Sequence, residues 1–212
     1  MAQRMIHYLF GEILSRQIEI KDKDRFLIGS ILPDAYVDGS ERNITHFKYK
    51  LKPDNKEYFD FNKFREQYFE LMQRDDLYLG YYMHLVEDAF YRQFLHSYQF
   101  KKPCNKEEVA LLHNDYHILN SYIIEKYDIQ NVLKKPFGFE QEPICKIATF
   151  GIDVFIETMV YDFIEKTLGE TYFLTENMLD EFIEKYMVLG MKELQNILNG
   201  KCSLQAIDYA WS

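Results

Sequence analysis

The segment 79–96, LGYYMHLVEDAFYRQFLH, constrains the fold more than any other part of the chain. It has no proline and carries apolar residues at helical spacing, so it predicts a helix. His84 and Asp88 lie four positions apart in it, which places an imidazole and a carboxylate one turn apart on one face. Apolar neighbours such as Leu85 and Ala89 predict that this face is dry. A buried pair of this kind can hold a cation between its two side chains. Taken alone, however, the spacing favours a core histidine bonded to a helix carboxylate, or a solvated pair, because motifs this short are frequent by chance.

The other histidines favour the metal interpretation. The first two lie in aromatic settings, MIHYLF and ITHFKY, and the last two repeat the four-residue spacing in LLHNDYHILN. Asp34 follows a proline in GSILPDAY, just past the end of a predicted apolar helix; a cap of the next turn is the structural alternative. Six histidines and two aspartates, all before residue 118, indicate a centre with more than one ion. The histidines are His7, His46, His84, His96, His113 and His117.

Length and composition predict a single all-α domain. A chain of 212 residues can bury one full core and is too short to argue for two domains. Leu, Glu and Lys are frequent, β-branched residues are sparse, and 17 Tyr with 17 Phe suit a tightly packed helical core. We therefore expect one helical domain over residues 1–212, with the metal-site residues concentrated in 5–120 and packing helices over 144–198.

The expected helices follow from apolar periodicity, caps and breakers. Asp75 and Asp76 precede the helix over 79–96 as capping carboxylates, and Asn105 with Glu108 forms a capping box for the helix that carries the last two histidines. The segment 37–56 is polar and turn-rich, and the terminal Trp211 is expected to be docked. Helices are predicted over 3–18, 25–32, 61–72, 79–96, from 105 past 117, 144–168 and 176–198.

Charge and cysteine usage narrow the class of protein. A net charge of −9 argues against a large basic surface for duplex nucleic acid. Three widely separated cysteines predict neither a disulfide framework nor a cysteine zinc site. The N-terminal stretch is an amphipathic helix rather than a signal peptide, and no apolar run is long enough to span a bilayer. We expect a soluble, cytoplasmic protein without a transmembrane segment; its oligomeric state is open.

The order of these motifs resembles the zinc-dependent phospholipase C family and the related S1/P1-type nucleases. The parts that carry the resemblance are GSILPD, THF and LGYYMHLVEDA, and they cover about residues 5 to 120. The resemblance implies an all-helical fold that binds three zinc ions in a cleft and cleaves phosphodiester bonds. By position, Asp34, His46, His84 and Asp88 would hold the first ion, Asp88 would bridge to the second, and His7 would serve that second ion.

The residues that would bind the third zinc ion match the family pattern less well. By position it would take His96, His113 and the residue four after it, which is His117 here and usually a glutamate in the family. The distance in sequence from Asp88 to His96 is also slightly stretched. Secreted members use a processed N-terminal amine as a ligand, and the absence of a visible signal peptide argues against that ligand here.

The resulting hypothesis is a metal-dependent phosphoric-ester hydrolase. Two ions about 3.5–4 Å apart would activate a water, and Asp34 would orient or deprotonate it as the catalytic residue. Imidazole with carboxylate suits Zn²⁺ best, and Mn²⁺ or Fe²⁺ also fit. The expected partner is a phosphoester small molecule or a phospholipid headgroup.

Two alternatives belong to other classes. One is a non-catalytic helical domain that keeps a single structural metal and acts as an interaction module. The other is an HD-type phosphohydrolase, which requires an adjacent His-Asp dipeptide; here His113-Asn114-Asp115 is only similar to it. Metal stoichiometry separates the first alternative from the hydrolase, because a structural metal needs one closed site and a hydrolase needs an open one.

Overall fold

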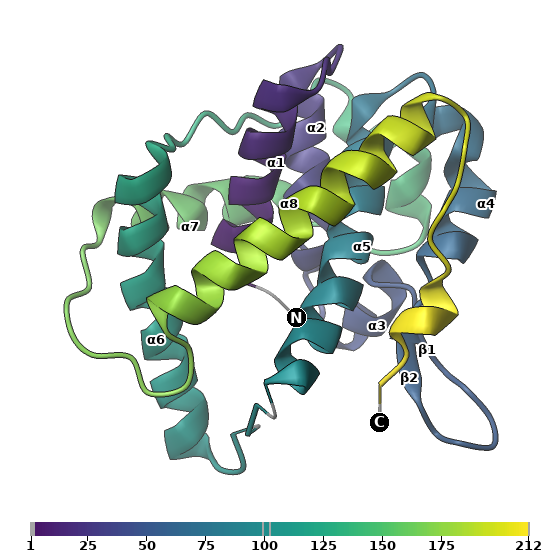
Figure 1. Ribbon diagram of the computed structural model, residues 1–212. Coiled ribbons are helices and arrows are strands. Elements are labelled where there is room, and N and C mark those ends of the chain that lie inside the picture. Colours follow the sequence, from purple (N-terminus) through teal and green to yellow (C-terminus); the bar gives the residue numbers. More distant parts are fainter. Residues whose placement is uncertain (1–2, 99, 102, 212) are drawn as a thin grey trace.

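Helices dominate a computed structural model that describes residues 3–98, 100–101 and 103–211 (Figure 1). The described residues form eight α-helices, short 3-10 turns and one two-stranded antiparallel sheet, which confirms the all-α prediction. The helices are α1 Arg4–Gln17, α2 Lys23–Ile31, α3 Arg42–Thr45, α4 Phe61–Met72, α5 Asp76–Ser97, α6 Lys106–Tyr127, α7 Ile152–Ile164 and α8 Glu176–Leu198. The strands are β1 Lys48–Lys50 and β2 Glu57–Phe59.

The predicted caps account for several helix starts. Asp75 is the N-cap of α5, and its side chain accepts a hydrogen bond from the backbone N–H of Leu77 at 3.0 Å. Asn105 caps α6 in the same way through the N–H of Glu108 at 2.8 Å. Such bonds satisfy backbone donors that the first turn of a helix leaves free. The sequence therefore predicts these helix starts to within a few residues.

The helix predicted over 144–168 is wrong as a continuous element. A 3-10 turn spans Pro143–Lys146, the chain then leaves helical geometry, and α7 covers only Ile152–Ile164. The intervening backbone bonds to the segment after Asp34 instead: the N–H of Gly151 donates to Ala35 at 2.8 Å, and the N–H of Val37 donates to Thr149 at 3.0 Å. These bonds replace the helical ones and anchor α7 beside the segment that carries Asp34.

The polar segment 37–56 contains α3 and β1 rather than only turns. The tail docks on the resulting hairpin, since Trp211 exchanges backbone hydrogen bonds with Glu57 at 2.7 and 2.8 Å. The indole ring packs against Phe59 with ring centroids 4.7 Å apart. The hairpin thus provides the docking place of Trp211.

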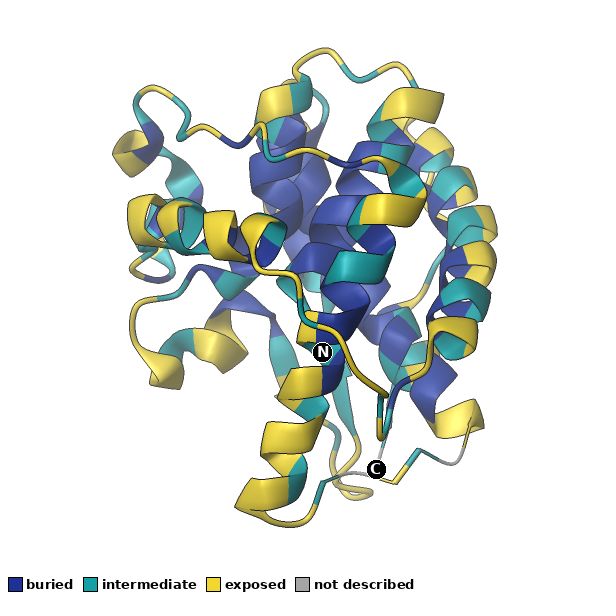
Figure 2. Ribbon diagram, turned by 90° about the vertical axis from the view of Figure 1, so that its left-hand side faces the viewer, coloured by how far each residue is buried: buried dark blue, intermediate teal, exposed yellow. Residues whose placement is uncertain are grey.

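Helix α5 runs through the middle of the core, and most of its residues are buried (Figure 2). It packs against α1, α2, α4 and α8, and its contact with α2 is the most extensive. A Cβ atom on Gly80 would lie 2.1 Å from the carbonyl oxygen of Phe26, and one on Gly29 would lie 2.0 Å from that of Leu77. Only glycine allows the two backbones to approach this closely.

None of the helices in the described part of the chain combines the length and the apolar character that crossing a bilayer requires.

Candidate metal centre

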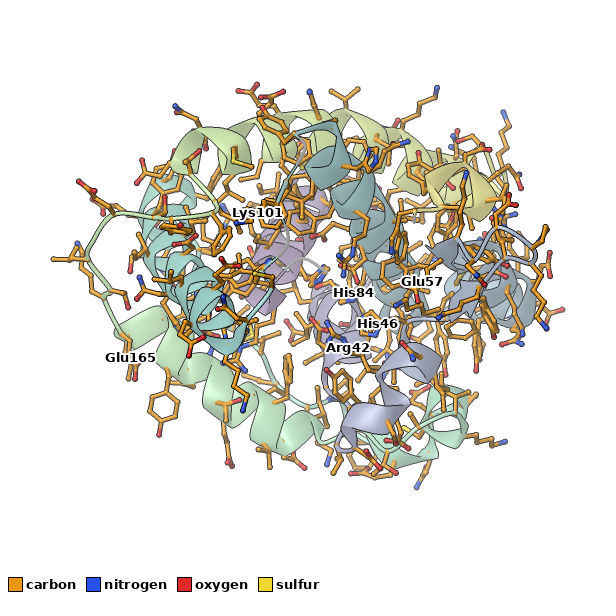
Figure 3. All side chains as sticks on the ribbon, turned by 90° about the horizontal axis from the view of Figure 1, so that it is seen from below. Arg42, His46, Glu57, His84, Lys101 and Glu165 are labelled. Carbon is orange, nitrogen blue, oxygen red and sulfur yellow. The ribbon has the colours of Figure 1, made fainter. Side chains whose placement is uncertain are left out.

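Five predicted site residues from four segments meet in the interior. His7 comes from α1, Asp34 from the 3-10 turn after α2, His46 follows α3, and His84 and Asp88 lie one turn apart on α5. The three histidines and Asp88 are almost completely buried, whereas 14% of the Asp34 side chain is exposed. Arg42, His46 and His84 lie together near the middle of the molecule (Figure 3).

The ring of His84 is oriented by the main chain of α2. Its Nδ1 lies 2.8 Å from the carbonyl oxygen of Ser30. A carbonyl only accepts hydrogen bonds, so Nδ1 carries the proton and the lone pair of Nε2 faces the cluster. Burial lowers the pKa of His84 to about 3, which keeps the ring neutral at physiological pH. A neutral imidazole with a free Nε2 is the form that binds a metal.

His46 is held in the same manner by the last turn of α3. Its Nδ1 lies 2.9 Å from the carbonyl oxygen of Arg42 and 3.0 Å from the Thr45 hydroxyl. Its Nε2 lies 3.2 Å from Oδ1 of Asp34 and 3.3 Å from Nε2 of His84. The hydrogen bond outside the cluster again leaves Nε2 directed inward.

His7 completes the set and brings in a carboxylate that the sequence did not single out. Its Nδ1 lies 3.0 Å from Oε2 of Glu87, while its Nε2 lies 3.8 Å from Asp34 and 3.7 Å from Asp88. The ring stacks on that of His84 with centroids 3.7 Å apart. Glu87 is buried, and a glutamate directly before Asp88 within an apolar helix was the only sequence signal for it.

The charges of the cluster shift several pKa values. Burial alone would lower the pKa of His7, but the neighbouring carboxylates of Glu87, Asp88 and Asp34 raise it to about 9. Burial raises the pKa of Glu87 to about 7. For Asp34, burial is outweighed by the contact with His46 and by the nearby histidines, which hold its pKa below the usual range. The centre therefore holds an ionised Asp34 and a His7–Glu87 pair that shares protons.

The donor set fits zinc. Two overlapping groups have their ligand atoms within 4.8 Å of one another, namely His7–Asp34–His84 and His46–His84–Asp88. Zinc with bonds of about 2.0–2.1 Å separates tetrahedral ligands by about 3.3 Å, close to the 3.2–3.8 Å distances around Nε2 of His46 and His84. Moreover, neither ring nitrogen of the buried His7 has a hydrogen-bond partner among the described residues, and Nε2, which faces Asp34 and Asp88, suits a metal ligand.

The remaining predicted ligands lie elsewhere. His96, His113 and His117 are exposed, and neither of the two groups found among the described residues includes them. His113 and His117 nevertheless line the same cavity as Asp34, on the side formed by α6. The third ion that the resemblance implies therefore stays a prediction.

A cavity of about 640 Å³ opens beside the cluster, a volume in the range of small-molecule sites. Of the five clustered residues, Asp34 is the one that lines it. Aromatic side chains from several segments supply much of the remaining wall: Tyr36, Phe100, Tyr116 and Phe155. The cavity thus gives a ligand access to the edge of the centre that Asp34 forms.

Comparison with known proteins gives one match. A family model described as zinc-dependent phospholipase C matches residues 6–201, well beyond the 5–120 over which the motifs alone carried the resemblance. Neither the curated proteins nor the solved structures contain a significant match. Because the matched region covers nearly the whole sequence and includes all the clustered residues, the chain belongs to the zinc-dependent phospholipase C family.

Proposed function

We propose that the protein hydrolyses phosphodiester bonds with zinc ions held by His7, Asp34, His46, His84 and Asp88. One observation carries this proposal: Nδ1 of His84 and Nδ1 of His46 bond to main-chain carbonyl oxygens, Nδ1 of His7 lies 3.0 Å from Glu87, and Nε2 of each ring faces the two aspartates. Acceptors at Nδ1 are typical of metal-binding histidines because they fix the tautomer and the ring orientation. Family membership and the two His/Asp groups support the broad class of a metal-dependent phosphoesterase.

The hydrogen bonds favour a particular division of the ligands. Nδ1 of His84 is engaged by Ser30, so only its Nε2 is available and it serves one ion. His46 and His84, whose Nε2 atoms are 3.3 Å apart, would hold that ion with Asp34 and Asp88. His7 would hold a second ion, with Asp88 shared between the two. Mn²⁺ and Fe²⁺ suit the same ligands, so metal identity is part of the test.

Asp34 is the proposed catalytic residue. Zinc bound in the centre supplies a Lewis acid for the phosphoryl group and makes water easier to deprotonate. Asp34 is partly exposed and faces the cavity, so its carboxylate can accept a hydrogen bond from a water there. Because its pKa lies below the usual range, Asp34 stays ionised at neutral pH and is better suited to orienting the water than to retaining its proton.

The cavity would bind the rest of the substrate. Its aromatic wall suits the organic part of a phosphoester, and Asp34 lies where the phosphoryl group would approach the centre. A phosphoester small molecule and a phospholipid headgroup both match this combination of an apolar wall and a polar end.

Metal content and hydrolysis, measured together, test the proposal. Protein purified without a His-tag or chelator is expected to contain about two ions per chain and to hydrolyse bis(p-nitrophenyl) phosphate. His84→Ala and Asp88→Ala are expected to lose both properties, whereas Glu66→Gln on the exposed face of α4 should keep both. A single ion without turnover after added Zn²⁺ or Mn²⁺ would reject the hydrolase and leave an interaction module with a structural metal.

A further inference from the structure

Two arginines border the candidate metal centre. Arg42 and Arg92 both line the cavity of about 640 Å³ that reaches Asp34. Both also line a smaller cavity of about 120 Å³ that reaches His46. The two cavities therefore share both arginines, and one reaches Asp34 while the other reaches His46. Figure 3 shows Arg42 beside His46 and His84.

The guanidinium group of Arg92 has no carboxylate partner in the described part of the chain. Arg92 lies one turn after Asp88 on α5, about 6 Å farther along the helix axis. It forms no ion pair with any carboxylate in the described part of the chain, and its buried Nε lacks a hydrogen-bond partner there. The group packs over the ring of Trp211, 5.5 Å from the centroid, which holds it in place. A buried donor of this kind is costly unless a ligand satisfies it.

The other charges on the wall of the cavity do not offset the positive charge of Arg92. Arg4 also lines the cavity, but its Nε lies 2.5 Å from Asp162, so these two charges cancel. Asp34 faces the histidine cluster, where bound cations would compensate its charge. The protein as a whole carries a net charge of −9, which makes two arginines at one cavity a local exception.

We propose that Arg92, together with Arg42, forms an anion subsite beside the metal centre, so that the preferred ligands are phosphoesters with a net negative charge. This inference rests on the proposed function and names its substrate class. A guanidinium group offers a planar fork of N–H donors that matches phosphate or carboxylate oxygens. A zwitterionic headgroup would place its own cation against the arginines, which costs binding energy.

Anion binding tests the subsite without relying on turnover. Pyrophosphate is titrated calorimetrically into the zinc-loaded and the metal-free protein, with Arg92→Gln compared with Arg74→Gln, an exposed arginine outside the cavity. Arg92→Gln is expected to raise the Kd at least tenfold and Arg74→Gln to leave it unchanged. Equal affinity in wild type and Arg92→Gln would overturn the proposal. If Arg92→Gln does not fold, Arg42→Gln decides by the same criterion.

Substrate choice provides a second test with two pairs of compounds. The soluble pair is bis(p-nitrophenyl) phosphate, an anion, against p-nitrophenyl phosphorylcholine, a zwitterion. The lipid pair is dihexanoyl phosphatidylserine against dihexanoyl phosphatidylcholine. A preference of about tenfold in kcat/KM for the anionic compound, lost in Arg92→Gln, supports the subsite. A preference within the soluble pair indicates that the natural ligand is a free phosphoester, and a preference within the lipid pair indicates a lipid headgroup.

The two tests separate failure of the subsite from failure of the proposed function. Hydrolysis without preference in either pair overturns the anion subsite and leaves the hydrolase intact. Absence of hydrolysis in every compound rejects the proposed function, and the pyrophosphate titration then still decides whether the arginines bind an anion.

Discussion

Nδ1 of His84 lies 2.8 Å from the carbonyl oxygen of Ser30, so a main-chain atom of α2 orients a side chain of α5. This contact depends on the close approach of the two helices at Gly29 and Gly80, which precede Ser30 by one residue and His84 by one turn. Helix packing and metal-site geometry are thereby linked. A change that separates the helices must also release the imidazole.

Gly80→Ala tests this link. The added Cβ would lie 2.1 Å from the carbonyl oxygen of Phe26, so α2 has to move away from α5. We expect a loss of about 1–3 kcal/mol or more in the free energy of unfolding, measured by urea denaturation, together with reduced zinc content. Gly39→Ala is the control, because nothing lies within 4 Å of its Cβ position, and it should change stability by about 0.5 kcal/mol or less. A Gly80→Ala protein with full stability and zinc would contradict the link.

Glu87→Gln tests the acceptor of His7. The substitution keeps the size of the side chain but removes the charge that faces Nδ1 of His7 at 3.0 Å. Loss of such an outer acceptor typically weakens metal binding about 10- to 100-fold, which a competition titration with a chromophoric chelator measures. Glu193→Gln is a matched control, since Glu193 is equally buried but bonds to Tyr82 and Ser203 outside the cluster. Equal losses of metal affinity in the two variants would show that removing any buried carboxylate weakens metal binding.

The parts of the fold that the sequence predicts are those specified by local signals. Helices α4 and α8 follow from apolar periodicity and sharp caps, and α5 and α6 begin where Asp75 and Asn105 predict. The break inside 144–168 has no such local signal. It arises because Gly151 bonds to Ala35, a contact between residues more than one hundred positions apart, and tertiary hydrogen bonds override helix propensity there.

The residues of the candidate site also divide into those that local sequence signals identify and those that only tertiary packing reveals. Histidine spacing and the Pro33-Asp34 turn single out the five residues that meet in the interior. The sequence does not single out Glu87 or Arg92, because a charged residue on a helix usually faces solvent. Only the packing of α1 and Trp211 against α5 shows that these two side chains border the site. Sequence spacing gives the turn on which a side chain lies, whereas its partner depends on elements far away in the chain.

Asp34→Asn separates catalysis from folding. The amide keeps the shape of the side chain and an oxygen that faces the cavity but cannot act as an anion toward water. We expect kcat for bis(p-nitrophenyl) phosphate to fall about 10²–10⁴-fold, with folding by circular dichroism unchanged. Asp38→Asn provides a control, because Asp38 caps the nearby turn at Ser40 and does not line the cavity. Activity within threefold of wild type in Asp34→Asn would reject the proposed role.

The raised pKa of His7 predicts proton release when zinc binds. With a pKa of about 9, His7 is protonated at pH 7 in the metal-free protein, so Nε2 must lose its proton to bind the ion while Nδ1–H stays with Glu87. Zinc affinity should therefore rise about tenfold per pH unit toward pH 9. Calorimetry in buffers of different ionisation enthalpy is expected to detect one more proton released at pH 7 than at pH 10. His7→Gln should remove that difference.

The raised pKa of His7 also makes the stability of the metal-free protein depend on pH, in the opposite direction to zinc affinity. A group whose pKa is higher in the folded than in the unfolded state stabilises the fold fully below about pH 6.5 and loses this contribution as the pH rises through about 9. His84, with a pKa lowered by burial to about 3, makes the fold less stable as the pH falls from about 6.5 to 3. Burial also raises the pKa of Glu87 to about 7, so protonation of Glu87 offsets the effect of His84 between about pH 7 and 4.5. Metal-free protein should thus lose stability as the pH rises above about 6.5 and as it falls below about 4.5 in urea denaturation. Since zinc binding strengthens as His7 deprotonates, the zinc-loaded protein should retain its stability as the pH rises above about 6.5. An equal loss of stability with and without zinc over this pH range would show that His7 does not bind the ion.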